Sequence, residues 1–201
     1  MSAVIRSVVI SGVGGQGLLT MGELLGEALI ERGFKVSVGE IHGLSQRGGS
    51  VVVFVKYGDV QPSPIVVEGE ANALVGLELI ETARRVQLLA PTGIVLANNY
   101  LLPPPASQKI PGREELIEAI RRAARNVILI NAVELARKAG SPVAVNMVML
   151  GALAASGTVD LGLADLKGVV EKKFTGRTGE VNARALILGF EEAQKQLREK
   201  A

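Results

Sequence analysis

Apolar residues near the start of the chain follow two different periods in succession. Residues 5–10 form a short run rich in β-branched side chains, which is typical of a buried strand. From residue 18 to residue 31 the apolar positions recur every three or four residues, which predicts an amphipathic helix that Gly33 ends. Residues 35–38 predict a second strand. This strand–helix–strand spacing predicts a right-handed crossover between parallel strands.

The rest of the chain continues the alternation of strands and helices. Residues 51–57 are an uninterrupted β-branched run, and residues 65–67 are expected to return beside it as a hairpin. The proline-rich stretch 102–111 is predicted to be a loop, because prolines in series lack backbone donors. Further strands are expected at 72–77, 93–97 and 127–130, and helices at 79–89, 113–125, 133–138, 143–155, 160–172 and 181–198. The predicted fold is α/β, a single Rossmann-like layered domain over residues 1–201 with a mostly parallel sheet, a β-hairpin extension and helices on both faces.

The most apolar stretch is predicted to be a buried helix. Ser141 and Pro142 suit its N-cap and first position, and Asn146 interrupts a run that is shorter than the roughly 20 residues of a membrane span. Small residues are expected to let a neighbouring helix approach closely; they are Gly151, Ala152, Ala154 and Ala155. The basic stretch 172–179 is interpreted as a linker between two helices, either solvated or part of a binding site.

Composition narrows the classes of function. The 201 residues contain no cysteine, which excludes disulfides, thiolate zinc sites, a cysteine nucleophile and cysteine-ligated iron–sulfur clusters on this chain. A net charge of +2 and only 3% aromatic residues argue against nucleic acid as a partner. No signal peptide or membrane span is recognised at the sequence level, so a cytoplasmic location is expected.

A glycine-rich turn follows the first predicted strand and precedes the first helix. Its sequence, Gly12-Val13-Gly14-Gly15-Gln16-Gly17, satisfies G-x-G-x-x-G in the strand–turn–helix context that this pattern requires. Backbone N–H groups at a helix N-terminus bind anions, so the turn is a candidate phosphate-binding loop. Alternatively, the glycines only permit a tight crossover, and Gln16 only orients the turn. Glu40 stands about where a Rossmann site places its ribose-binding acid, which keeps a nicotinamide or flavin cofactor open.

A second motif follows the second predicted strand. It carries the only histidine of the chain, His42, and then Ser45, Gln46, Arg47, Gly48 and Gly49. Ligands of open α/β sheets bind at the carboxyl ends of strands, where this loop is expected to lie. His42 is a candidate acid or base, or a hydrogen-bonded loop anchor. Arg47 is a candidate bidentate partner for phosphate or carboxylate, or a contact between subunits.

Together the two motifs make the chain similar to a known family. It resembles the gamma-domain family of 2-oxoacid:ferredoxin oxidoreductases, and within it the small (beta) subunits of the indolepyruvate type. The resemblance covers nearly the whole chain. The second motif is the more specific one, because pyruvate-type relatives generally differ ahead of Arg-Gly-Gly.

The resemblance implies a subunit of an enzyme that decarboxylates an aryl 2-oxoacid and passes electrons to ferredoxin, with coenzyme A as acyl acceptor. Thiamine diphosphate and 4Fe–4S clusters are expected on a large (alpha) partner subunit. Gly58-Asp59-Val60 lacks the second glycine of a thiamine-diphosphate motif, which agrees with that division. The resemblance implies a domain beside the active site that is associated with coenzyme A, which we place against the glycine turn, Ser45, Gln46, Gly48 and Gly49. From their own chemistry, His42 and Arg47 are the predicted catalytic residues.

Two other functions remain open from the residues alone. A stand-alone NAD(P)- or flavin-binding oxidoreductase would use the glycine turn with Glu40 on the ribose. A non-catalytic structural subunit would use both motifs only as docking surfaces.

Overall fold

The computed structural model describes residues 4–43, 48–103 and 109–200. The strands are β1 (Ile5–Val13), β2 (Lys35–His42), β3 (Ser50–Gly58), β4 (Ala71–Gly76), β5 (Leu89–Asn98) and β6 (Asn126–Ile130). The α-helices are α1 (Leu18–Glu31), α2 (Leu79–Arg85), α3 (Arg113–Ala123), α4 (Ala132–Ala139), α5 (Val145–Ala155), α6 (Leu163–Lys173) and α7 (Gly176–Lys200). Short 3₁₀ turns, η1 (Val86–Leu88) and η2 (Pro142–Ala144), follow α2 and precede α5.

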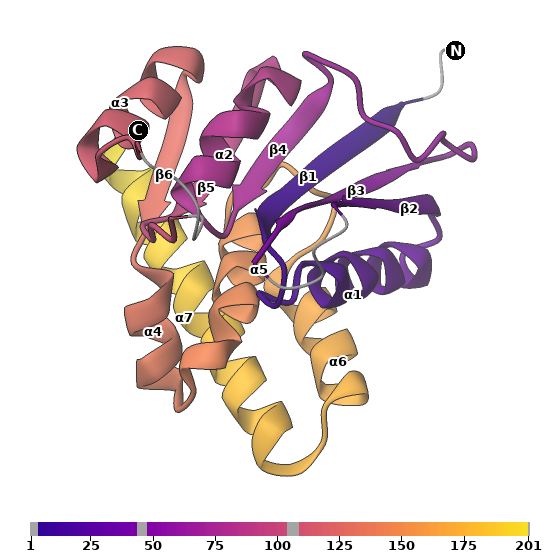
Figure 1. The fold of residues 1–201 in the computed structure, drawn as a ribbon. Coiled ribbons are helices and arrows are strands. Elements are labelled where there is room, and N and C mark those ends of the chain that lie inside the picture. Colours follow the sequence, from indigo (N-terminus) through magenta and orange to yellow (C-terminus); the bar gives the residue numbers. More distant parts are fainter. Residues whose placement is uncertain (1–3, 44–47, 104–108, 201) are drawn as a thin grey trace.

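The strands form one six-stranded sheet in the order β2-β3-β1-β4-β5-β6. Strands β1, β4, β5 and β6 pair in parallel, whereas β3 is antiparallel to both β1 and β2 (Figure 1). The mostly parallel α/β fold is confirmed. As predicted, β2 runs parallel to β1, but β3 lies between them, so the crossover does not join neighbouring strands.

The hairpin exists with a different partner from the expected one. Strand β3 pairs with the preceding strand β2, from Lys35 opposite Gly58 to His42 opposite Val51. Residues 65–67 are not a strand, so the predicted return was wrong. Pro62 and Pro64 cannot donate to a ladder. Instead this segment fastens to the outer strand through Ser37, whose hydroxyl donates to the Pro62 carbonyl over 2.7 Å.

An ion pair between buried Lys56 and partly exposed Glu70 holds the segment between β3 and β4 against the sheet. The Lys56 ammonium lies 2.5 Å from a Glu70 carboxylate oxygen and donates to the Ile65 carbonyl, and the Lys56 side chain is 8% exposed. The backbone N–H of Val67 donates to the other Glu70 oxygen. Burial alone would raise the pKa of Glu70, but the hydrogen bonds from Lys56 and Val67 hold this pKa below its ordinary value of 4.5.

The lowered pKa predicts an acid-sensitive contribution to stability. Because the folded pKa of Glu70 lies below the unfolded one, the contribution is complete above the unfolded value and is lost as pH falls through the folded value. We expect Glu70→Gln to lower the free energy of unfolding by about 1 kcal/mol at neutral pH, with the difference shrinking in acid. Urea unfolding across pH measures this, with the exposed Glu118→Gln as control. A difference that stays constant with pH would contradict it.

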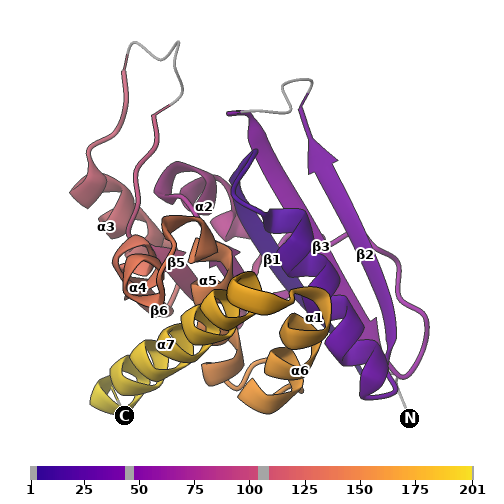
Figure 2. The same cartoon turned by 90° about the horizontal axis from the view of Figure 1, so that it is seen from below.

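Apolar side chains alternate along the strands and fill both faces of the sheet. Val8 and Ile10 belong to the larger cluster with α1, α4, α5, α6 and α7, whereas Val9 belongs to the cluster under α2 and α3. Figure 2 views the sheet from the side of the larger cluster. Helices therefore cover both faces, as the period of two predicts.

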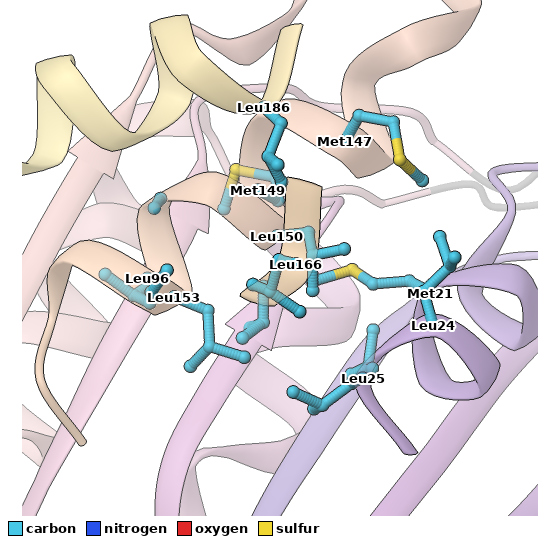
Figure 3. Packing of buried hydrophobic residues seen from close by; sticks show 14 of the residues in the cluster. Met21, Leu24, Leu25, Leu96, Met147, Met149, Leu150, Leu153, Leu166 and Leu186 are labelled. Atoms are coloured by element: carbon cyan, nitrogen blue, oxygen red, sulfur yellow. The ribbon is translucent and has the colours of Figure 1, made fainter. Parts of the chain in front are cut away.

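The predicted buried helix is α5, which lies at the centre of the larger cluster. Figure 3 shows Leu150 and Leu153 of α5 among side chains from α1, α6 and α7. The small-residue prediction is confirmed at Gly151, where an added Cβ would lie 1.9 Å from the Leu186 carbonyl oxygen of α7. Within the described part of the chain, no helix is long and apolar enough to cross a membrane.

The linker between α6 and α7 is shorter than predicted. Helix α7 already begins at Gly176, so residues 176–179 are helical. Lys172 and Lys173 each lie 2.7 Å from a carboxylate of α1, on Glu31 and Glu23 respectively. These two lysines therefore tie α6 to α1.

Candidate functional site

The glycine turn is held by the side chain of Gln16. Its amide oxygen accepts from the Val13 N–H over 2.7 Å, and its amide nitrogen lies 3.4 Å from the Leu77 carbonyl oxygen. A Cβ on Gly12 would lie 2.5 Å from that Gln16 oxygen, which explains a glycine at this position. Gln16 thus orients the turn, in line with the alternative that the sequence left open.

The turn delivers the chain into the N-terminus of α1. Gly15 and Gly17 have φ of 98° and 76°, in the left-handed region that glycine adopts without strain. The first N–H groups of a helix have no intrahelical acceptor, and they carry a partial positive charge. Gly15 is exposed, so an anion can reach this end of the helix. The strand–turn–helix geometry predicted for an anion-binding loop is present.

Asn146 of α5 closes the inner side of the turn. Its amide nitrogen lies 3.3 Å from the Gly17 carbonyl oxygen, and a Cβ on Gly17 would lie 2.5 Å from the same nitrogen. The one polar residue in the apolar run therefore supports the start of α1.

The second motif meets the first through backbone hydrogen bonds. The Gly14 N–H donates to the Gly49 carbonyl over 2.9 Å, and the Gly48 N–H donates to the Gly14 carbonyl over 3.5 Å. Gly48 has a φ of 75°, which a residue with a side chain rarely adopts. The structure thus brings Gly48 and Gly49 onto the glycine turn. Ser45, Gln46 and Arg47 lie outside the described residues.

His42 lies at the same edge of the sheet but on the outermost strand. It is aligned with Val51 of β3, which is in turn aligned with Gly12 of β1. Two strand spacings, about 10 Å, separate its backbone from the glycine turn. The ring is half exposed, with Nε2 3.6 Å from a Glu40 carboxylate oxygen and Nδ1 3.2 Å from the Gly43 carbonyl oxygen.

Glu40 does not take the place of a Rossmann ribose-binding acid. In that fold the acid ends the strand next to β1, whereas β3 separates β2 from β1 here. Glu40 is also two residues short of the end of β2, aligned with Val53. The prediction of a Rossmann-type ribose contact is therefore not supported by the strand order.

Buried polar groups behind the two motifs were missed in the sequence. Glu78 and Asn98 are completely buried, and Glu81 is nearly so. Glu78 accepts from the N–H groups of Glu81 and Leu102, and Asn98 accepts from the Ala132 N–H and donates to the Leu77 carbonyl. Asn98 ends β5 and Glu78 comes two residues after the end of β4, and a polar residue at a strand end is the signal that a sequence reader can use.

Two cavities flank the exposed Val143 between the glycine turn and α7. The smaller, about 200 Å³, is lined by Gly15, Gln16 and Tyr100 among others. The larger, about 540 Å³, lies between the first turns of α1, α5 and α7 and includes Arg177. No acidic side chain lines either cavity among the described residues. In the same part of the chain, no group of three His, Asp or Glu side chains is arranged to hold a metal ion.

Comparison with known proteins identifies the family. Residues 7–192 match the pyruvate ferredoxin/flavodoxin oxidoreductase family, to which the chain belongs. It is 34% identical to indolepyruvate oxidoreductase subunit IorB of Archaeoglobus fulgidus over 191 residues, which covers 93% of this chain and 94% of that protein. The chain is a small subunit of a 2-oxoacid:ferredoxin oxidoreductase, and the resemblance inferred from the two motifs is confirmed.

Solved structures share the fold over nearly the full length. Pyruvate oxidoreductase subunit PORC of Thermotoga maritima has a TM-score of 0.69 at 25% identity, and the match covers 93% of this chain and 96% of that one. A 2-oxoglutarate:ferredoxin oxidoreductase chain of Magnetococcus marinus has a TM-score of 0.72 at 18% identity, covering 95% of this chain but 31% of that one. The same fold thus occurs both as a separate subunit and within a longer chain.

Proposed function

We propose that residues 1–201 form one gamma-type domain that supplies part of the coenzyme A site in an indolepyruvate-type 2-oxoacid:ferredoxin oxidoreductase. The observation that carries the proposal is the backbone pairing of Gly14 with Gly48 and Gly49 in front of α1. It joins both motifs at the N-terminus of α1, where backbone N–H groups favour an anion, and among the described residues no acidic side chain lines the cavity beside Gly15 and Gln16. The name of the Archaeoglobus relative supports an aryl 2-oxoacid as the substrate class.

The residues present fit a phosphate-bearing ligand. Gly15 is exposed at the N-terminus of α1, where a phosphate group of coenzyme A would accept from backbone N–H groups. Coenzyme A supplies the thiol that takes up the acyl group, and the Magnetococcus enzyme was solved with coenzyme A bound. In this chain Gly12, Gly14, Gly15, Gln16 and Gly17 would form the anion cradle.

The binding free energy that one helix N-terminus supplies is smaller than micromolar affinity requires, so further contacts are needed. Such an end contributes up to about 2 kcal/mol in a partly buried site, whereas micromolar affinity corresponds to about 8 kcal/mol. We assign part of the difference to Arg47 with Ser45 and Gln46, and the rest to the large subunit. His42 is assigned to a proton-transfer or substrate contact at the outer strand, where its ring is accessible.

The large (alpha) subunit is proposed to carry the remaining chemistry. Thiamine diphosphate would activate the 2-oxoacid there, and 4Fe–4S clusters would pass its electrons to ferredoxin. This chain has no cysteine for a cluster. We place the assembled enzyme in the cytoplasm.

The proposal is tested by Gly14→Val in the assembled enzyme. A branched side chain where the two motifs and the ligand meet should raise the KM for coenzyme A by tenfold or more, with folding and assembly retained. Gly168→Val is the matched control, because an added Cβ at Gly168 meets nothing within 4 Å. An unchanged KM for coenzyme A in a normally assembled Gly14→Val enzyme would refute the proposed site.

A further inference from the structure

A buried carboxylate reaches the junction of the two motifs from behind. The Glu81 side chain, in the first turn of α2, is only 5% exposed. One of its oxygens accepts from the Ser50 hydroxyl over 2.5 Å, and the other lies 3.0 Å from an Arg84 guanidinium nitrogen. Arg85 also reaches the Ser50 hydroxyl, over 3.4 Å. The carboxylate is therefore both paired and hydrogen-bonded, as a buried charge requires.

Ser50 links this carboxylate to the glycine turn. It is the first residue of β3, aligned with Val13 at the end of β1, and it directly follows Gly48 and Gly49. Those two glycines have no side chains of their own to hold them in place, and glycine loses more conformational freedom on ordering than any other residue. The Ser50 hydroxyl is the first side-chain anchor after the pair.

We propose that Glu81 is a positioning residue of the anion site: through Ser50 it holds Gly48 and Gly49 against Gly14 and so fixes the backbone donors that meet the ligand. This inference rests on the proposed function. In this proposal Glu81 does not contact the ligand itself. Glu81 acts on the geometry of the glycine turn. That geometry determines how well the backbone N–H groups point toward the bound anion.

The buried neighbour Glu78 shows that the role is specific to Glu81. Glu78 lies on the same helix turn and is completely buried, but its carboxylate accepts from backbone N–H groups of Glu81 and Leu102. It caps α2 and holds the chain after β5. Glu81, and not Glu78, accepts from the hydroxyl of Ser50, the residue that directly follows the Gly14 partners Gly48 and Gly49.

The first test uses the full chain alone and needs no ligand. Hydrogen exchange at the Gly14 amide reports on its bond to the Gly49 carbonyl. We expect Glu81→Ala and Ser50→Ala each to speed this exchange at least tenfold, and the double variant to add little to either single change. Glu81→Gln, which keeps an acceptor for the hydroxyl, should restore most of the protection. The exposed Glu118→Ala is the control.

The second test uses the assembled enzyme. Ser50→Ala and Glu81→Ala should raise the KM for coenzyme A about five- to thirtyfold while kcat at saturating coenzyme A stays within about twofold. If Gly14→Val raises this KM but neither of these variants does, the positioning role is overturned and the proposed site stands. If Gly14→Val leaves the KM unchanged as well, the proposed site itself fails. A loss of thermal stability with normal Gly14 exchange would likewise overturn the positioning role. Ser50→Ala keeps the test open should Glu81→Ala not fold.

Discussion

Gly151→Ala should destabilise the protein by about 3 kcal/mol, because helices α5 and α7 pack too closely at this point to leave room for a methyl group. An added Cβ would lie 1.9 Å from the Leu186 carbonyl oxygen and 3.0 Å from the Phe190 backbone nitrogen. Backbone atoms of a packed helix cannot move aside as a side chain can. Helix α7 would have to shift away from α5, which opens the largest core cluster.

A glycine-to-alanine substitution at Gly168 provides the control. Gly168 is also within a helix, but a Cβ there meets nothing within 4 Å. Gly168→Ala should therefore stabilise the protein by about 0.5–1 kcal/mol through the lower backbone entropy of alanine. Chemical denaturation of both variants measures the difference. Equal free energies of unfolding for Gly151→Ala and the wild type would contradict the close α5–α7 contact.

Arg47→Ala in the assembled enzyme should lower kcat/KM about thirtyfold. This corresponds to about 2 kcal/mol, the size of a charge-assisted contact. Arg47→Lys should already lose part of the activity, because lysine keeps the charge but not the planar pair of donors. Steady-state kinetics with both variants, together with the yield of co-purified complex, separates a ligand contact from a subunit contact. Near-normal turnover with weakened assembly would favour a docking role and the structural-subunit alternative.

The pattern of apolar residues within short stretches predicted the bounds of several elements well. Helix α1 spans Leu18–Glu31 as the apolar spacing predicts, and β4 and β6 lie within a residue of the expected strands. Glycine spacing and the strand–helix context also predicted the strand–turn–helix arrangement at residues 12–17. Each of these features depends on residues that are close together in the sequence, so the pattern within one stretch is enough to predict it.

Strand order depends on contacts between distant residues and could not be read in the same way. The β-branched run of β3 suits an inner strand between β1 and β2 as well as a hairpin with residues 65–67. In the folded protein β1 and β2 occupy both edges of β3, which leaves no edge for residues 65–67. The site shows the same limit. Glu81, in the first turn of α2, and Glu78, at its N-cap, are acidic residues that would ordinarily be exposed, but the fold buries both.

We propose that this chain contributes one part of a divided active site. The most direct measurement purifies the chain alone and together with its large subunit, then assays coenzyme A-dependent ferredoxin reduction with an aryl 2-oxoacid. We expect a colourless, inactive small chain and activity only in the complex. Iron–sulfur absorbance or 2-oxoacid decarboxylation by the chain alone would contradict it.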